Sequence, residues 1–366
     1  MTTKCRFLYL IDQLGSGGTE RQLFYLLQRM NREQYKPAVT VWRFNQNDVY
    51  IPRIRALGVP LYFLPSGVNS IVKLRALRRL VTKLKPEVFH SYCFYPNFAA
   101  YWATWGKKIV TLGSVRCDFI TEKKGAGFFL GRLSSLLPHW QIYNNFAAAQ
   151  TVSCSKSIFK PRIVSVVPNG VDLQHFQYTP LPSKKVPFIL GVGTLVPRKR
   201  WDRLITAASA LKRDGFTCKI RIAGEGPLRK KLEENVRQLG LTDTVEFLGH
   251  TTDVTALLAS SSFLVHTSDI EGSPNIVMEA MACGRAIVAT DAGDVPALID
   301  DGKTGFVVQR GDQQALIKKI QMLIENTCLR DQMGKAGRLK AEGYFGLEQM
   351  VSGTFAVYNS VGWRNS

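Results

Sequence analysis

Short, nearly continuous apolar runs alternate along the whole chain with runs in which apolar residues recur every three or four positions. The first kind is typical of buried strands and the second of amphipathic helices. In the first half, we predict strands at 6–11, 38–42, 60–63, 88–91, 109–112, 151–153 and 165–167, and helices at 20–30, 50–57, 70–84 and 96–105. In the second half, we predict strands at 188–192, 219–223, 245–248, 263–266, 286–289 and 305–308, with helices such as 201–212, 227–239, 275–281 and 313–325.

This alternation predicts βαβ units, parallel sheets and an α/β fold made of two doubly wound domains. The Pro-rich, polar run 177–187 marks the linker, which we place near residues 172–186. We predict a first Rossmann-like domain at 1–175 and a second at 176–345. Doubly wound domains bind ligands at the carboxyl ends of their strands, so we expect the ligands in a cleft between the two domains.

The composition excludes several classes of protein. With 366 residues, 45% of them hydrophobic, the chain is long enough for two globular domains. No apolar run approaches the roughly 18–20 residues of a membrane span, and the N-terminus resembles a strand more than a signal peptide. The seven cysteines are scattered and odd in number, and the five histidines lack metal-ligand spacing. We therefore expect a cytoplasmic protein with reduced thiols, no metal site and no cofactor.

Charge is distributed unevenly. Residues 1–172 contain 24 Lys and Arg against 8 Asp and Glu, a balance of +16, whereas residues 173–366 contain 24 against 20, a balance of +4. We expect the first half to meet an anionic partner: a membrane surface, nucleic acid or a phosphorylated acceptor. In the helix predicted at 70–84, the apolar residues form one face and most basic residues lie away from it. This pattern fits an ordinary surface helix or a basic face that meets anionic lipid.

Two glutamates eight residues apart, Glu271 and Glu279, mark the most informative stretch. Ser273 suits the N-cap of the following helix, and Pro274 suits its first position. The next three amides would point out of the helix start without an internal partner, and such an end attracts phosphate. These amides belong to Asn275, Ile276 and Val277. A diphosphate site with two carboxylates for hydroxyl groups suits a nucleotide-sugar, and the alternative is one Glu in a surface loop and one on a solvated helix face.

Other loops that follow predicted strands carry glycine or basic residues. Gly17 and Gly18 would allow close backbone approach to a phosphate, and the alternative is a tight turn. Arg198 and Lys199 could neutralise a departing diphosphate in place of a metal ion, and the alternative is a solvated basic turn. Gly249, at the end of another strand, could let a flat base lie against the backbone.

In order and spacing, these segments resemble glycosyltransferase family 4, the retaining group 1 enzymes with the GT-B fold. The resemblance rests on residues 17–20, 168–172, 192–199, 223–227, 245–249, 271–284 and 301–308. It covers nearly the whole chain, and the run 271–284 is its most specific part. It also implies that residues 346–366 form a closing helix that returns to the first, acceptor-binding domain.

The resemblance implies a role for each matched residue. Glu271 would contact the donor sugar near the reacting carbon, Glu279 would hold the ribose hydroxyls, and Lys199 would hold the diphosphate. The other implied donor contacts are Gly17, Gly18, Leu248, Gly249, Gly272, Ser273, Pro274, Asn275, Ile276 and Val277. The family often has an arginine where this chain has Thr194, and Arg198 is the candidate to supply that charge.

By this resemblance the protein would be a hexosyltransferase that moves a sugar from a nucleotide-diphosphate-sugar to a hydroxyl acceptor, with retention and without a metal ion. Acceptors of the family are often lipid-linked, so we expect a glycolipid or polysaccharide acceptor and peripheral binding at the inner face of the membrane. His90 and Arg116 are candidate acceptor contacts, although a lone histidine is more often structural. A sugar-nucleotide epimerase of GT-B fold is the nearest alternative. A basic nucleic-acid-binding protein is a more distant one, because the sequence shows no nucleic-acid motif.

Overall fold

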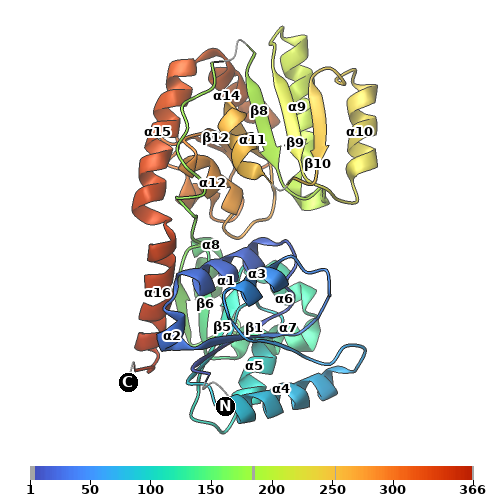
Figure 1. The fold of residues 1–366 in the computed structure, drawn as a ribbon. Helices are drawn as coiled ribbons and strands as arrows, with labels where there is room; N and C mark the ends of the chain where they lie inside the picture. Colours follow the sequence, from blue (N-terminus) through green and yellow to red (C-terminus); the bar gives the residue numbers. More distant parts are fainter. Residues whose placement is uncertain (1–4, 184–185, 252, 365–366) are drawn as a thin grey trace. The chain divides into compact units, whose positions relative to one another are not determined.

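The computed structural model describes residues 5–183, 186–251 and 253–364. It divides into two compact units, one formed by Met1–Gly170 with Leu347–Ser366 and the other by Val171–Gly346 (Figure 1). Each unit is a Rossmann-like α/β structure in which every described strand pair is parallel, as the alternating pattern predicts. The first segment of the first unit ends at Gly170, a few residues before the predicted boundary at 175. Residues 184 and 185 of the predicted linker lie outside the described residues.

The first unit contains a seven-stranded sheet in the order β3-β2-β1-β4-β5-β6-β7. Its strands are β1 (Phe7–Ile11), β2 (Pro37–Val41), β3 (Leu61–Phe63), β4 (Val88–Ser91), β5 (Val110–Val115), β6 (Trp140–Tyr143) and β7 (Ile163–Val166). Its helices are α1 (Gly18–Arg29), α2 (Arg32–Tyr35), α3 (Tyr50–Ala56), α4 (Ser70–Leu84), α5 (Asn97–Thr104), α6 (Phe119–Gly125), α7 (Phe128–Leu136), α8 (Phe146–Ser153) and α16 (Leu347–Ser360). The strand order reverses between β1 and β4, which is the topological switch point of this sheet.

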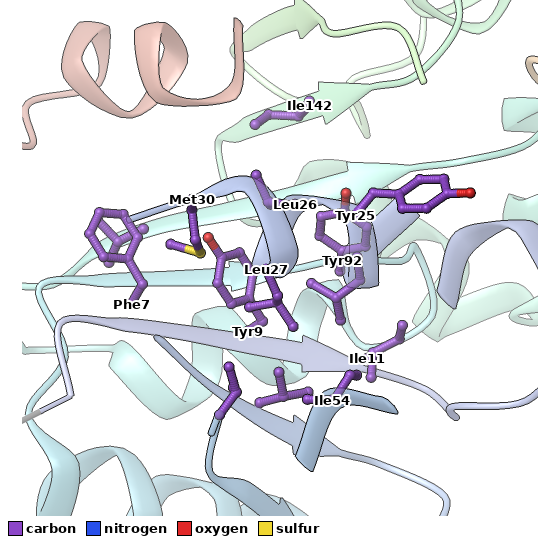
Figure 2. Close-up of a cluster of buried hydrophobic side chains, with 14 of the residues drawn as sticks. Phe7, Tyr9, Ile11, Tyr25, Leu26, Leu27, Met30, Ile54, Tyr92 and Ile142 are labelled. Atoms are coloured by element: carbon purple, nitrogen blue, oxygen red, sulfur yellow. The ribbon is translucent and has the colours of Figure 1, made fainter. Parts of the chain in front are cut away.

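Alternate residues of β1 enter two different cores, because successive side chains of a strand point to opposite faces. Phe7, Tyr9 and Ile11 pack in one cluster with residues of α1, α3 and α16 (Figure 2). Leu8 and Leu10 enter the other cluster, with residues of α4 and α5. Helices therefore cover both faces of the sheet, which explains why the apolar runs of the sequence are nearly continuous.

The C-terminal helix α16 contributes to the core of the first unit. Met350 and Tyr358 are buried in the same cluster as β1. Trp363, just beyond the helix, packs edge-on against Phe7 with the ring centroids 4.9 Å apart. Its Nε1 donates to Glu87 Oε2 at 2.9 Å. The end of the chain therefore completes a core that the N-terminal strands begin.

One predicted strand of the first unit is wrong. Residues 151–153 form the end of α8, and the strand in this region is β6, which the sequence pattern did not predict. Asn145 caps α8 by accepting the amide of Ala148 at 2.7 Å, and the alanines that follow favour a helix. With only four residues, β6 is too short to show a clear period.

The second unit contains a six-stranded sheet in the order β10-β9-β8-β11-β12-β13. Its strands are β8 (Phe188–Val192), β9 (Lys219–Ala223), β10 (Val245–Gly249), β11 (Phe263–His266), β12 (Ala286–Thr290) and β13 (Phe306–Val308), each within one residue of its predicted ends. Its helices are α9 (Trp201–Arg213), α10 (Arg229–Gln238), α11 (Val254–Ser260), α12 (Asn275–Ala282), α13 (Val295–Leu298), α14 (Gln313–Glu325) and α15 (Thr327–Tyr344), with a short 3₁₀ helix, η1 (Pro197–Lys199). The order reverses between β8 and β11, so the loops after these two strands flank the switch point.

Candidate functional site

The loops after β8 and β11 bring three ionisable side chains together at the switch point of the second unit. Lys199 ends η1, which follows β8, and Glu271 lies in the loop after β11. Lys199 Nζ lies 2.5 Å from Glu271 Oε1, and only 13% and 11% of the two side chains are exposed. His266, the last residue of β11, places Nε2 3.1 Å from the same oxygen. Doubly wound sheets bind their ligands in crevices at such switch points.

The surroundings keep Glu271 ionised and His266 neutral. Burial alone would raise the pKa of Glu271, but the contacts with His266 and Lys199 outweigh it and hold that pKa far below its ordinary value. Burial lowers the pKa of His266, although the neighbouring carboxylate opposes this effect. The site therefore offers one fixed carboxylate and one ammonium group with little water around them, where charge interactions are strong.

The loop after β11 is tied to the turn after β8. Thr267 Oγ1 donates to the carbonyl oxygen of Lys199 at 2.9 Å. The carboxylate of Asp269 accepts from Arg200 at 2.9 Å and from Arg203 at 2.6 Å. These bonds join the segment that carries the glutamate to the segment that carries the lysine, so the geometry of the pair does not depend on the side chains alone.

On its other side, the same loop rests against the turn after β12. Gly293 has a φ of +55°, and a β-carbon there would lie 2.5 Å from the carbonyl oxygens of both Glu271 and Gly272. The amide of Asp294 donates to the carbonyl of Gly272 at 2.9 Å. Only glycine suits both the conformation and the space at residue 293. The backbone at Glu271 is therefore held from two sides.

Helix α12 starts directly after this loop. Pro274 occupies its N-cap and Ser273 precedes the cap, each one residue earlier than predicted, so that Asn275 and Ile276 open the first turn. The amide of Val277 donates to the carbonyl of Pro274 at 3.1 Å. This bond corrects the expectation that the Val277 amide points out of the helix without an internal partner.

Both glutamates of the pair are shielded from solvent. Glu279 lies one turn inside α12 and is 4% exposed, and Glu271 is only slightly more exposed. Gly272, between them, is also buried. Burial of both carboxylates argues against the alternative of a surface loop followed by a solvated helix face, because unpartnered surface glutamates stay in water.

The loops after β8, β9 and β10 are in backbone contact with one another. A β-carbon on Gly224 would lie 1.9 Å from the carbonyl oxygen of Gly193. The amide of Gly224 donates to the carbonyl of Gly249 at 2.8 Å, and Gly249 has a φ of +77°. Leu248 is half-buried at the end of β10. These loops place Leu248 and Gly249 at the same sheet edge as Lys199.

Thr194 and Arg198 lie on the exposed side of the turn after β8. The carbonyl of Thr194 accepts from Trp201 Nε1 at 3.0 Å, which anchors the turn to α9. The basic side chain that reaches Glu271 is that of Lys199, not that of Arg198. The role of Arg198 at a diphosphate stays a prediction.

In the first unit, the predicted phosphate loop follows β1 at the switch point. Gly17 is the N-cap of α1 and Gly18 its first residue, and both are exposed. Glu20 folds back against this turn, since a β-carbon on Gly17 would overlap its carboxylate. Burial raises the pKa of Glu20. The loop is therefore an open backbone surface beside a shielded carboxyl group.

His90 lies inside the first unit and is fully buried. Its Nδ1 lies 2.8 Å from the hydroxyl of Tyr358 and its Nε2 lies 2.8 Å from Ser114 Oγ. Burial and the charge of Arg116 hold the pKa of His90 well below its ordinary value. This geometry supports a packing role and does not support an acceptor contact by His90. Arg116 is half-buried, with its guanidinium carbon 4.0 Å from the centroid of the Tyr92 ring.

A cavity of about 440 Å³ opens at the carboxyl ends of β1, β2 and β4. Its lining residues are Asp12, Arg43, Cys93, Phe94, Tyr95, Glu122, Gly125 and Ala126. Arg43 Nε donates to Asp12 Oδ1 at 2.8 Å. The amide of Arg116 donates to Glu122 Oε1 at 3.3 Å, while Oε2 is buried without a hydrogen-bond partner among the described residues. Burial raises the pKa of Glu122 to about 8, so its carboxyl group is protonated near neutral pH.

Comparison with known proteins assigns both halves of the chain to one group of enzymes. A family model described as "Glycosyl transferases group 1" matches residues 176–340, and one described as "Glycosyltransferase Family 4" matches residues 16–175. The chain belongs to the group 1, family 4 glycosyltransferases. The predicted family and the predicted α/β GT-B fold are thereby confirmed.

Individual relatives support this assignment. An uncharacterized glycosyltransferase of Haemophilus influenzae is 32% identical over 44% of this glycosyltransferase and 46% of that protein, so the chain spans about half the length of that relative. An α-1,4-N-acetyl-D-galactosaminyltransferase of Campylobacter jejuni, whose name specifies a PP-undecaprenol-linked glycan, is 25% identical over 89% of this chain and 90% of its own. The structure of Anabaena HepE in complex with UDP-glucose matches with a TM-score of 0.81 at 18% identity, covering 97% of this chain and 99% of that one.

Three residues of this glycosyltransferase were missed by the analysis of the sequence: His266, Asp269 and Glu122. His266 ends a predicted strand five residues before Glu271, and that position at a carboxyl end is the one signal that could have identified it. Asp269 pairs with two arginines that follow β8, so its role becomes visible only when the order of the strands in the sheet is known. Glu122 lies in α6, a short helix that the apolar pattern does not predict.

Proposed function

We propose that this glycosyltransferase moves a sugar from a nucleotide-diphosphate-sugar to a hydroxyl acceptor, with retention of configuration at the reacting carbon. The observation that carries the proposal is the shielded trio of Lys199, Glu271 and His266 at the switch point of the second unit. Glu271, in the loop after β11, lies shortly before the start of α12 at Asn275. A cation and a helix start favour a diphosphate, and a fixed carboxylate favours sugar hydroxyls.

Each part of the donor can be assigned to one of these groups. In the proposed complex, Lys199 turns from Glu271 to the diphosphate, which also accepts from amides at the start of α12. Glu271 then faces the hydroxyls of the transferred sugar. Glu279 takes the ribose hydroxyls, and the base lies along Leu248 and Gly249 at the end of β10.

The proposed reaction exchanges one bond to the reacting carbon for another on the same face of the sugar. The bond from that carbon to the diphosphate oxygen breaks, and negative charge builds on the diphosphate, next to Lys199. The acceptor oxygen forms the new bond, and its proton passes to the departing diphosphate. Glu271, which stays in contact with His266, stabilises the positive charge that develops on the sugar ring.

The cavity of the first unit is the proposed acceptor site. Asp12 offers a carboxylate to a hydroxyl group, and Tyr95, which is partly exposed, offers a ring on which a sugar could stack. The unsatisfied Oε2 of Glu122 is available for one more hydrogen bond. We propose a glycan acceptor carried on a lipid, which the PP-undecaprenol in the name of the Campylobacter relative supports. A hexose as the transferred sugar stays a proposal as well.

The decisive variant is Glu271→Gln, which keeps the size of the side chain and removes its charge. We expect transfer to fall by about 10²–10³-fold, as for loss of one charged group at a reacting centre, with nucleotide affinity nearly unchanged. Isothermal titration calorimetry with the nucleotide and a transfer assay measure the two effects separately.

The matched control is Glu246→Gln, at an exposed glutamate that pairs with Arg221 at 2.7 Å on the surface of the same unit. Its transfer rate should equal that of the unchanged protein. Full activity of the Glu271→Gln variant would remove Glu271 from the mechanism and with it the proposed reaction at this site.

Two further measurements define the substrate and the class of reaction. A thermal-shift panel of UDP, GDP, ADP and their sugars identifies the nucleotide, because a ligand that binds only the folded state raises the melting temperature.

We infer that no metal ion is needed, since Lys199 and the helix start supply positive charge, and we expect transfer to persist in EDTA. A product consisting of epimerised sugar nucleotide, with no transfer to any acceptor, would instead favour an epimerase.

We also propose that the protein acts as a cytoplasmic, peripheral enzyme at an anionic membrane surface. On α4, Arg75, Arg79 and Lys83 are exposed and spaced four residues apart, which aligns them on one face of the helix. Leu77 and Val81 are buried on the other face. Reversal of these three charges to Glu should weaken sedimentation with anionic vesicles at low salt, and unchanged sedimentation would contradict a role for α4.

A further inference from the structure

An exposed apolar groove lies between helices α6 and α7 and the segment 156–159 of the first unit. Its volume is about 780 Å³. Phe128 and Ile158 line it with 69% and 81% of their surfaces exposed, and the adjacent Phe129 is 79% exposed. Large apolar side chains gathered at this exposure mark an interaction surface more often than a defect of packing.

The packing of α7 directs Phe129 away from the interior and leaves Phe128 at the edge of the contact with α6. Gly131 faces the backbone of α6, where a β-carbon would lie 2.2 Å from the carbonyl oxygen of Lys123. One turn later, the buried Ser134 is held through its carbonyl oxygen, which accepts from Gln141 Nε2 at 2.9 Å. Phe129 lies on the opposite side of the helix from these two residues and faces outward, whereas Phe128, three residues before Gly131, lies at the edge of the contact with α6 and is still 69% exposed.

Basic side chains surround the apolar groove. Lys123, Lys124, Arg132 and Lys156 belong to its lining, which includes no acidic residue. The guanidinium carbon of Arg132 lies 3.5 Å from the ring centroid of Phe128. Apolar side chains that project outward among lysines and arginines match the interface of an anionic bilayer, in which apolar groups enter the acyl region and cations meet the phosphates.

Helix α6 separates this groove from the proposed acceptor cavity. Lys123, Lys124 and Ile120 face the groove, whereas Glu122, Gly125 and Ala126 line the cavity. The two sets alternate along the helix because residues three or four apart share a face. A surface bound to lipid at the groove would therefore place the bilayer one helix away from the cavity.

We propose that the groove formed by α6, α7 and residues 156–159 is a membrane-insertion site, in which Phe128, Phe129 and Ile158 enter an anionic lipid bilayer. The part of this proposal that concerns the acceptor rests on the proposed function, since a lipid-carried glycan would rise from the bilayer beside the acceptor cavity.

The insertion site is distinct from the basic face of α4. Helix α5 packs against both α4 and α7, so the two surfaces belong to one helical layer of the first unit. Among the described residues, we find no helix with the length and hydropathy of a membrane span.

Vesicle sedimentation tests the apolar contribution. The probes are vesicles of phosphatidylcholine alone and of phosphatidylcholine with phosphatidylglycerol. The unchanged protein should bind only the anionic vesicles, and Phe128→Ser with Phe129→Ser should weaken that binding by about tenfold for each phenylalanine. The matched control is Leu339→Ser with Tyr344→Ser, on α15 of the second unit, where both side chains are 70% exposed. The control should bind as the unchanged protein does.

Fluorescence tests insertion directly. Phe129→Trp should be quenched by lipids brominated on their acyl chains, whereas Leu339→Trp should not, after subtraction of the signal of the six native tryptophans. A Trp at residue 129 that is not quenched, or serine variants that bind as tightly as the unchanged protein, would overturn insertion and leave only charge attraction. If the unchanged protein does not bind vesicles but binds another protein through Phe128 and Phe129, insertion would likewise be overturned.

The two proposals fail in different experiments. Hydrolysis of the nucleotide-sugar in detergent should be unchanged in the Phe128→Ser, Phe129→Ser variant, because neither residue belongs to the donor or acceptor site. An active enzyme that does not bind vesicles would overturn the membrane proposal alone. A fully active Glu271→Gln variant would overturn the proposed reaction and leave vesicle binding as evidence for the groove.

Discussion

At the scale of single residues, the chemistry of the donor site depends on one carboxylate with two stabilising neighbours. Glu271 is kept ionised by Lys199 and His266, although its burial acts in the opposite direction. His266 is neutral, so its Nε2, 3.1 Å from Glu271 Oε1, is a polar contact and not a second positive charge. Of the three residues, His266 is the one whose contribution can be removed without changing the charge of the site.

We predict that His266→Leu moves the acid limb of the pH–rate profile to higher pH, because it removes one contact that lowers the pKa of Glu271. A polar contact with a charged group contributes at most about 1.5–3 kcal/mol, so transfer should fall by up to roughly ten- to a hundredfold at neutral pH. His266→Gln keeps a donor and should restore most of the rate. If the acid limb stays in place in the leucine variant, His266 does not tune Glu271.

We predict that Glu122 makes the first unit less stable as the pH rises from the ordinary glutamate value of 4.5 to about 8. Its pKa is raised on folding, so between these values the folded protein binds more protons than the unfolded protein, and stability falls with pH. Glu122→Gln should remove this dependence and stabilise the protein by about 1–3 kcal/mol at pH 8. Denaturant unfolding at pH 5.5 and pH 8 checks it, and equal pH slopes in both proteins would contradict the prediction.

At the scale of elements, the loops after the strands matter more than the strands themselves. The glutamate loop after β11 is bonded to the turn after β8 and rests on the turn after β12. Each of these contacts joins segments that are far apart in the sequence and adjacent in the sheet order. The position of Glu271 is thus a property of three strand ends.

We predict that Gly293→Ala displaces the glutamate loop, because the new methyl group would overlap the carbonyl oxygens of Glu271 and Gly272. It should cost at least about 2 kcal/mol of stability and lower transfer by more than tenfold. Gly302→Ala is the matched control, since Gly302 also has a positive φ, of +75°, but has open space around it. It should cost about 1 kcal/mol and leave transfer unchanged. Similar activity losses in both variants would argue against a specific role for the Gly293 contact.

At the scale of the whole molecule, the chain passes from the first unit to the second and returns. Helix α16 and Trp363 complete the core around β1, so the first unit cannot finish folding until the end of the chain is available. The two units also differ in charge, since most of the positive balance lies in the first half of the sequence. This division fits a basic unit for acceptor and membrane and a nearly neutral unit for the donor.

We predict that Trp363→Ala destabilises the first unit by about 3–5 kcal/mol, the usual cost of removing a buried tryptophan. Hydrogen-exchange mass spectrometry should show faster exchange in peptides of β1 and α1, with peptides of β11 and α12 unchanged. Binding of the nucleotide identified by the thermal-shift panel should instead slow hydrogen exchange in peptides of α12. Equal destabilisation of both units would mean that they unfold as one cooperative body.

The sequence by itself determined the fold class, the family and nearly every element with a strong period. The strands β8, β9 and β11 and the helices α4 and α14 are found at their predicted bounds, because apolar spacing and terminal residues act locally. The strand β6 and the helices α6 and α8 were missed or misassigned, because each is short and its structure is set by contacts that it makes after folding.

Only the tertiary structure decided how the site is built. It placed His266 beside Glu271, buried the candidate acceptor residue His90 in the core, and left Phe128 and Phe129 exposed. It also showed that Asp269 anchors its loop through Arg200 and Arg203, which follow another strand. These outcomes depend on which strand ends are neighbours and on which side of a helix meets the sheet. A one-dimensional pattern shows that a residue ends a strand or lies on a helix, but the sheet order and the packing of backbones decide what it touches.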